Sequence, residues 1–179
     1  HVLFTFINVA RQDENKNQIA IIRAFQKLYM QNKGTHLILA GDGPCHDMLV
    51  NETKKLGLID AINLPGSVGN VRDYYAVSDV YVQASHREAM PMSVLEALAA
   101  GLPIISTDVG GLSDVVKDNG FLIPDDNDKA LYDIIGRVAT LPEIELKKMS
   151  SVSKTISNRY SSEKMAQEYT KLYLKVGKG

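Results

Sequence analysis

Two glutamates with seven residues between them, Glu88 and Glu96, lie in the segment HREAMPMSVLEALAAG. Of all segments in this sequence, this one has the clearest pattern of residues that could bind a ligand. Pro91 favours the first turn of a helix that would carry Glu96. The free backbone amides at the start of such a helix attract an anion such as a diphosphate. Carboxylates on either side of those amides are suited to accept hydrogen bonds from sugar hydroxyls. Glutamates at this spacing also occur on ordinary solvated helices, so that interpretation stays open.

Arg11 and Lys16 flank a polar segment, RQDENK, before a predicted helix. A guanidinium and an ammonium group at a strand-to-helix turn can bracket a phosphate. The alternative is a solvated loop in which Asp13 and Glu14 pair with their neighbours. Residues 41–44 (GDGP) lack the glycine spacing of dinucleotide-binding and P-loop motifs, so their predicted role is a tight turn into a helix.

The composition excludes several classes of protein. The chain has 179 residues, a net charge of −1 and one cysteine, so we expect neither a nucleic-acid binder nor an internal disulfide. Its four histidines show no metal-ligand spacing, and no HExxH, CxxC or Gly-x-Ser-x-Gly motif occurs, so no metal site is expected. The opening segment lacks the features of a signal peptide, and no apolar run approaches about 18 residues. The predicted location is cytoplasmic.

Segments with strand character alternate with segments in which apolar residues have helical spacing, and these segments must position the residues named above. Six short runs with strand character, bounded by Gly, Pro, Asn or Asp, are residues 2–9, 36–40, 61–64, 79–83, 103–107 and 120–123. Helical spacing marks residues 17–31, a stretch behind Pro44, and residues 71–77, 92–100, 129–139, 143–158 and 162–176. This alternation predicts one α/β domain over residues 1–179. It would be a doubly wound, Rossmann-like parallel sheet of about six strands, with helices on both faces and a helical carboxyl-terminal trailer.

An open parallel sheet binds its ligand at the carboxyl ends of the strands, where the strand order reverses. The segments that follow the first five predicted strands begin at Ala10, Gly41, Pro65, Ser85 and Asp108. They contain the glutamate pair, the Arg-x4-Lys motif and most of the glycines in turns. We therefore expect the chemistry of this chain on one rim of the sheet.

Together these motifs resemble the carboxyl-terminal, donor-binding domain of a GT-B-fold glycosyltransferase of the retaining family 4, or group 1. The resemblance runs in order through Arg-x4-Lys, LILAGDGP, LPGSV, AVSDVYVQAS, Glu-x7-Glu, EALAAGLPIISTDVGG and GFLIPDDN. The chain departs from the family pattern at Ala10, where glycine is usual, and at Ala89 and Met90, where Gly-Phe is usual. These departures leave the identity of the sugar open.

The resemblance implies roles for individual residues. Arg11 and Lys16 would bind the donor diphosphate and stabilise the departing nucleotide, Glu96 would hold the ribose hydroxyls, and Glu88 would contact the transferred sugar. Arg11, Lys16 and Glu88 are therefore the implied catalytic residues. Further donor contacts are implied at Gly66, Ser67 and Val68 for the base, at Met90 for the sugar, and at the amides of Met92 and Ser93 for the phosphates.

The resemblance also implies that the chain is one half of an enzyme. The enzyme would transfer a sugar from a nucleotide-diphosphate donor, UDP-linked before GDP-linked, to an unknown acceptor in glycan, polysaccharide or lipopolysaccharide synthesis. It would need no metal or other cofactor. The amino-terminal acceptor domain is missing, and a stripe of Tyr169, Leu172, Tyr173 and Val176 on the last helix would return to it. Membrane association is expected of the full-length enzyme only.

Three other functions compete with this one. A non-catalytic nucleotide-sugar binding module has Ala89 and Met90 in its favour. A GT-B sugar-nucleotide epimerase is disfavoured by the glutamate pair and its flanks. A nicotinamide dehydrogenase is disfavoured because RQDENK, rather than a glycine fingerprint, follows the first predicted strand.

Overall fold

The computed structural model describes residues 3–176, in which six strands form one parallel sheet of order β3-β2-β1-β4-β5-β6. The strands are β1 (Phe4–Val9), β2 (Thr35–Ala40), β3 (Ile62–Gly66), β4 (Val80–Gln83), β5 (Ile104–Thr107) and β6 (Gly120–Ile123). Each strand overlaps one of the predicted runs. The predicted fold class is confirmed.

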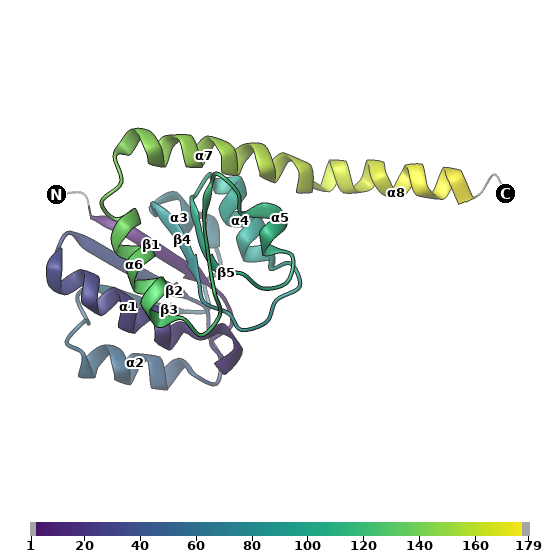
Figure 1. Ribbon diagram of the computed structural model, residues 1–179. Helices are drawn as coiled ribbons and strands as arrows, with labels where there is room; N and C mark the ends of the chain where they lie inside the picture. The colour runs from purple at the N-terminus through teal and green to yellow at the C-terminus, as the bar shows by residue number, and fades with distance from the viewer. Residues whose placement is uncertain (1–2, 177–179) are drawn as a thin grey trace.

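Helices cover both faces of this sheet (Figure 1). On one face are α1 (Gln18–Gln31), α2 (His46–Lys55) and α6 (Asp128–Val138). On the other are α3 (Val71–Ala76), α4 (Met92–Ala100) and α5 (Leu112–Val115). Helix α7 (Glu143–Ser157) contacts both core clusters, with Leu146 against the first and Ile156 in the second. Two 3₁₀ turns, η1 (Glu14–Lys16) and η2 (Asn158–Tyr160), and the terminal helix α8 (Ser162–Val176) complete the chain. The sequence did not predict α5, because four residues are too few to show a helical period.

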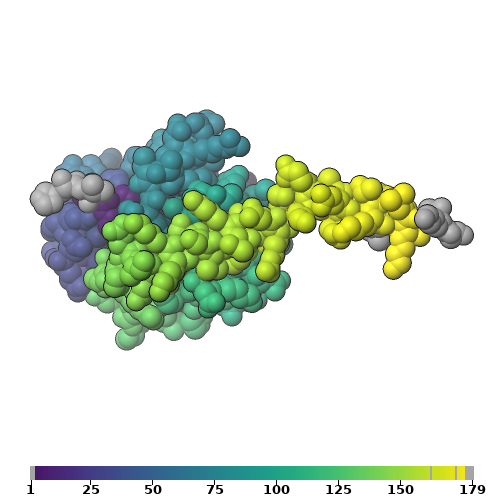
Figure 2. All heavy atoms as spheres, turned by 90° about the horizontal axis from the view of Figure 1, so that it is seen from above, coloured from purple at the N-terminus to yellow at the C-terminus, as the bar shows by residue number. Residues whose placement is uncertain are grey.

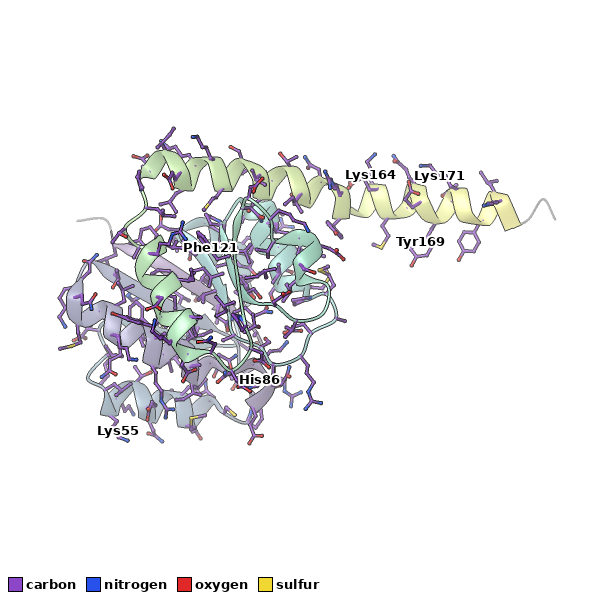
Figure 3. All side chains as sticks on the ribbon, in the orientation of Figure 1. Lys55, His86, Phe121, Lys164, Tyr169 and Lys171 are labelled. Atoms are coloured by element: carbon purple, nitrogen blue, oxygen red, sulfur yellow. The ribbon has the colours of Figure 1, made fainter. Side chains whose placement is uncertain are left out.

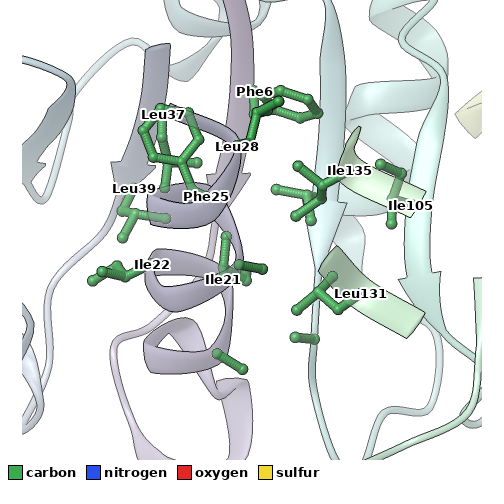
Figure 4. Packing of buried hydrophobic residues seen from close by; sticks show 14 of the residues in the cluster. Phe6, Ile21, Ile22, Phe25, Leu28, Leu37, Leu39, Ile105, Leu131 and Ile135 are labelled. Carbon is green, nitrogen blue, oxygen red and sulfur yellow. The ribbon is translucent and has the colours of Figure 1, made fainter. Parts of the chain in front are cut away.

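Neighbouring strand residues point into two different cores. Phe6 belongs to the cluster between the sheet and helices α1 and α6, while Ile7 belongs to the cluster on the opposite face, and both are almost fully buried. Figure 4 shows the first cluster, in which Ile21 and Phe25 of α1 and Ile135 of α6 pack over the strands. A sheet buried on both faces must be apolar at successive positions, which explains the continuous apolar runs in the sequence.

The strand order reverses between β1 and β4. The chain adds β2 and β3 on one side of β1 and then returns to place β4 on the other. Inside this junction the side-chain amide of Asn8 donates to the carbonyl of Val82 over 2.8 Å, and Asn8 is 1% exposed. The loops after β1 and β4 therefore leave the sheet side by side, where a parallel sheet binds its ligand.

The glycine-rich turn after β2 supports the loop after β1. A Cβ atom on Gly41 would lie 2.0 Å from the Ala10 carbonyl oxygen, and one on Gly43 would lie 2.4 Å from that of Gln12. The amide of Cys45 donates to the same Gln12 carbonyl over 2.9 Å. Backbone this close tolerates only glycine, which agrees with the structural role predicted for residues 41–44.

The carboxyl-terminal trailer has two parts. Helix α7 lies across the sheet domain and packs beside α4, whereas α8 extends beyond the body of the molecule (Figures 1 and 2). Tyr169 and Tyr173 of the predicted stripe are exposed, and the side chains of Leu172 and Val176 lie outside the described residues. Within residues 3–176, no helix combines the length and the apolar character that a membrane span requires.

Candidate functional site

An ion pair joins the two loops that meet at the β1–β4 junction. The side chain of Asp13 accepts a hydrogen bond from the Lys16 amide and so caps η1, which ends at Lys16. Glu88 lies in the loop after β4, and the distance from Lys16 Nζ to Glu88 Oε1 is 2.5 Å. These side chains are 21% and 9% exposed. The structure therefore brings together one residue from each of the two charged motifs.

Asn15 adds two hydrogen bonds between the same loops. Its side-chain amide donates to the backbone carbonyl of Arg87 over 2.9 Å, and its backbone carbonyl accepts from the backbone amide of His86 over 2.9 Å. A hollow of about 600 Å³ opens over this contact, lined by Glu14, Asn15, His86 and Arg87. The sequence offered one signal for Asn15, its place inside the RQDENK segment, and our interpretation of the sequence missed it.

The loop after β5 supports the backbone of Glu88 from beneath. Gly110 has φ +59°, and a Cβ atom there would lie 2.0 Å from the Glu88 carbonyl oxygen. The amide of Gly111 donates to the Ala89 carbonyl over 2.8 Å. Both the left-handed conformation and the close approach require glycine at position 110.

Helix α4 begins beside this loop with its first amides available. Pro91 is the N-cap residue, one position before the first turn where the sequence predicted it, and no side chain caps the helix. The first backbone N–H groups of a helix have no partner within it, and they carry the positive end of the helix dipole. The Ser93 hydroxyl is engaged with Tyr81 Oη over 2.9 Å, which leaves the amides of Met92 and Ser93 as the groups of interest.

Glu96 lies in the second turn of α4, where a buried tyrosine holds it. Tyr75 Oη donates to Glu96 Oε2 over 3.2 Å and lies 3.0 Å from the Ser93 carbonyl oxygen. Burial raises the pKa of Tyr75, so its hydroxyl stays protonated at neutral pH. A groove of about 490 Å³ opens here between α3 and α4, lined by Val71, Arg72, Tyr75, Ala76, Glu96, Ala99 and Ala100. The sequence pattern assigned Tyr75 no function, because an aromatic residue in a helix is usually part of the core.

Arg11 does not join the ion pair. Its side chain is 71% exposed, and its guanidinium Nε lies 3.7 Å from Asp13 Oδ2. The carbonyl of Arg11 accepts from the buried Gln18 side chain over 3.0 Å, so the backbone is fixed while the guanidinium extends into solvent. Arg11 is on the predicted rim, where its guanidinium lies near Asp13.

The residues predicted for the base lie farther along the rim. Gly66 ends β3, and its carbonyl accepts from the Gly41 amide over 2.8 Å. Ser67 follows it, and Val68 packs against the core cluster under α3 and α4. Met90 packs against the same cluster, so part of its side chain serves the core.

Within the described part of the chain, one group of side chains has potential metal-ligand atoms close together, namely His86, Asp125 and Asp126, whose atoms lie within 4.8 Å of one another. His86 Nδ1 is 2.9 Å from Asp125 Oδ1 and 3.4 Å from Asp126 Oδ1. These contacts join the loop after β4 to the loop after β6 at the exposed edge where Figure 3 labels His86. A hydrogen-bonded connection between two loops accounts for the arrangement.

The family model described as "Glycosyl transferases group 1" matches residues 3–155. The chain belongs to the group 1 glycosyltransferases. An uncharacterized glycosyltransferase of Haemophilus influenzae is 29% identical to it over 168 residues, which are 92% of this chain and 47% of that protein. The N-acetyl-alpha-D-glucosaminyl L-malate synthase of Bacillus anthracis is 27% identical over 158 residues, 87% of this chain and 41% of that protein. This group 1 chain therefore spans a little under half the length of these two curated relatives.

Solved structures of glycosyltransferases share the fold of this group 1 chain. HepE of Anabaena in complex with UDP matches with a TM-score of 0.88 at 21% identity, over 97% of this chain and 49% of HepE. The pneumococcal O-GlcNAc transferase GtfA in complex with UDP and GlcNAc matches with a TM-score of 0.88 at 22% identity, over 98% and 36%. The sheet has the fold of the Rossmann-like domains of GT-B glycosyltransferases, as the sequence predicted.

Proposed function

We propose that this chain is the donor-binding half of a retaining glycosyltransferase, which moves a sugar from a nucleoside-diphosphate sugar to an acceptor. The observation that carries the proposal is the contact between Lys16 and Glu88, because it joins the Arg-x4-Lys and Glu-x7-Glu motifs at the point where the strand order reverses. The structures of HepE and GtfA hold UDP, which favours a UDP-linked donor over a GDP-linked one.

In this proposal the diphosphate lies between Lys16 and the start of α4. Lys16 is partly buried and already directed at Glu88, and the uncapped amides of Met92 and Ser93 are donors of fixed direction. Arg11 turns in from solvent to complete the site. Cations and oriented amides stabilise the negative charge that develops on a departing diphosphate, so the proposal includes no metal or other cofactor.

Glu96 receives the ribose hydroxyls in this arrangement. Its carboxylate lines the groove between α3 and α4, and a nucleoside seated there extends toward the loop after β3. Gly66, at the end of β3, and Ser67 and Val68 of that loop contact the base. Glu88, with Met90 beside it, contacts the sugar near the reacting carbon.

The transfer step is a substitution on one face of the sugar. The bond between the anomeric carbon and the diphosphate oxygen breaks, and the acceptor hydroxyl oxygen bonds to the same face of that carbon. The proton of the acceptor hydroxyl passes to the departing diphosphate oxygen. Lys16 and Arg11 stabilise the leaving group, and Glu88 stabilises the positive charge that develops on the sugar ring.

The acceptor site belongs to an amino-terminal half that this chain does not contain. The curated relatives are about twice as long as the segment matched here, which supports this division of the enzyme. Helix α8 offers a contact surface, since Figure 3 shows Tyr169 on one side of the helix and Lys164 and Lys171 on the other. The 179-residue chain is therefore expected to bind nucleotide weakly and to transfer no sugar.

Calorimetry with UDP, GDP, ADP and dTDP tests the proposal. UDP is expected to bind most tightly, and Arg11→Ala and Glu96→Ala are each expected to weaken it about tenfold. Arg23→Ala and Glu143→Ala, which remove the same charges elsewhere on the surface, are the matched controls and should bind like the wild type. The proposal is wrong if no nucleotide binds, or if the controls lose as much affinity as the site variants.

A further inference from the structure

The hydroxyl of Tyr75 connects two helices across the groove that holds Glu96. Tyr75 is on α3 and Glu96 is on α4, and the bond between them spans 21 residues of sequence. Tyr75 is 3% exposed, so its ring is packed in the core, and the residue lines the groove together with Glu96. Glu96 is exposed, and the Tyr75 hydroxyl donates a hydrogen bond to one of its carboxylate oxygens.

The ring of Tyr75 is held from a second direction. Its centroid lies 6.4 Å from that of Tyr81, a fully buried residue of β4. The Tyr81 hydroxyl contacts Ser93 Oγ over 2.9 Å and also lies 3.3 Å from Gln83 Oε1. Two buried tyrosines therefore fix the first turns of α4 against α3 and β4.

The Tyr75 hydroxyl has one hydrogen and two acceptors within reach, the Ser93 carbonyl and the Glu96 carboxylate. A carbonyl at the start of a helix accepts from the amide four residues later, so Ser93 has another donor available within α4. A carboxylate is the stronger acceptor of the two. Burial raises the pKa of Tyr75, and the proton therefore remains on its oxygen.

We propose that Tyr75 is the positioning residue of the ribose site, holding one oxygen of Glu96 so that the other oxygen is presented to the ribose hydroxyls. This inference rests on the proposed function, which places the ribose at Glu96. A glutamate on an exposed helix face otherwise samples many rotamers, and ordering it on binding reduces affinity. Tyr75 lines the same groove but is 3% exposed, and in this inference it acts through Glu96.

The test compares wild type, Tyr75→Phe, Tyr74→Phe and Glu96→Gln by calorimetry with UDP, GDP and their 2′-deoxy and 3′-deoxy analogues. The readout is the ratio of the affinity for each ribonucleotide to that for its deoxy analogues. Tyr75→Phe keeps the buried ring and is expected to weaken binding of the preferred ribonucleotide about three- to tenfold, with much less effect on the deoxy forms. Tyr74→Phe removes the neighbouring hydroxyl of the same helix and should behave like the wild type.

The outcome distinguishes a failure of this inference from a failure of the proposed function on which it rests. If Glu96→Gln lowers the ratio and Tyr75→Phe does not, the positioning role is wrong while the ribose site stands. If Tyr75→Phe weakens ribose and deoxyribose forms equally, its role is only structural and the inference is overturned. If Glu96→Gln leaves the ratio unchanged, or no nucleotide binds, the proposed placement of the ribose fails, and the inference fails with it.

Discussion

The loop after β4 and the second turn of α4 each present one glutamate of the site, and they hold it in different ways. Glu88 is 9% exposed at its side chain and is paired with a cation, Lys16. Glu96 is exposed and accepts from a neutral hydroxyl, that of Tyr75. Removing a partner from a partly buried ion pair leaves a charge without compensation, whereas a solvated carboxylate loses little. The region of Glu88 therefore contributes to stability, and the region of Glu96 is free to serve a ligand.

The largest expected effect comes from Gly110→Ala, which disrupts the support beneath Glu88. The new Cβ would collide with the Glu88 carbonyl, and we expect a loss of about 2 to 4 kcal/mol in the free energy of unfolding. Gly57→Ala is the matched control, because Gly57 has φ +68° and nothing within 4 Å of the added Cβ. It should lose about 1 kcal/mol. Equal losses in urea denaturation would show that the contact with Glu88 has no effect beyond the backbone conformation.

Glu88→Gln tests the ion pair itself. It leaves Lys16 without its carboxylate, and we expect a loss of about 1 to 2 kcal/mol in the free energy of unfolding. Glu143→Gln breaks a pair with Lys147 whose members are 80% and 69% exposed, and it should leave the urea midpoint unchanged. If both variants unfold at the same urea concentration, Glu88 is no more important to stability than a surface charge.

Asn15→Ala is expected to have a smaller effect on the same region. It removes the hydrogen bond to the Arg87 carbonyl, so a loss of about 0.5 to 1 kcal/mol is predicted. Asn51→Ala, on the exposed face of α2, controls for the loss of an asparagine. Amide hydrogen exchange should show faster exchange in residues 84–91 for Asn15→Ala alone. Unchanged exchange there would contradict a role for Asn15 in joining the loops.

The smallest effect on stability is expected for Glu96→Gln. Its side chain is solvated and Tyr75 can still donate to the new amide oxygen, so the free energy of unfolding should change by less than about 0.5 kcal/mol. Nucleotide affinity should nevertheless fall about tenfold. A variant that loses stability and affinity together would contradict the difference between the two glutamate regions.

The sequence predicted most of the fold because the apolar runs of the strands and the helical spacing of apolar residues are both clear in it. The two-sided burial of the sheet makes strands such as β1 continuously apolar, and the stripes on α1 and α6 are long enough to show a helical period. The short elements η1 and α5 were not predicted, because they depend on local capping and on one or two glycines rather than on a periodic spacing of apolar residues.

The sequence could predict which rim of the sheet carries the candidate site, but not how the individual side chains meet there. Strand order made it reasonable that Lys16 and Glu88 would approach each other, because the segments after β1 and β4 leave the sheet together. The direction of the Arg11 side chain and the bond from Tyr75 to Glu96 depend on how individual rotamers and two packed helices meet. No pattern in a single sequence encodes those contacts. The roles of the site residues remain predictions, and the family and the sheet are confirmed.

The most direct measurement is a titration of the isotope-labelled chain with UDP, followed through its backbone amide resonances. A donor site at the β1–β4 junction predicts the largest changes at Lys16, Glu88 and Ser93, with smaller ones at residues 66–68. Resonance changes confined to α1, α2 and α6, which lie on the face of the sheet opposite α3 and α4, would contradict a nucleotide site at the ends of β1 and β4.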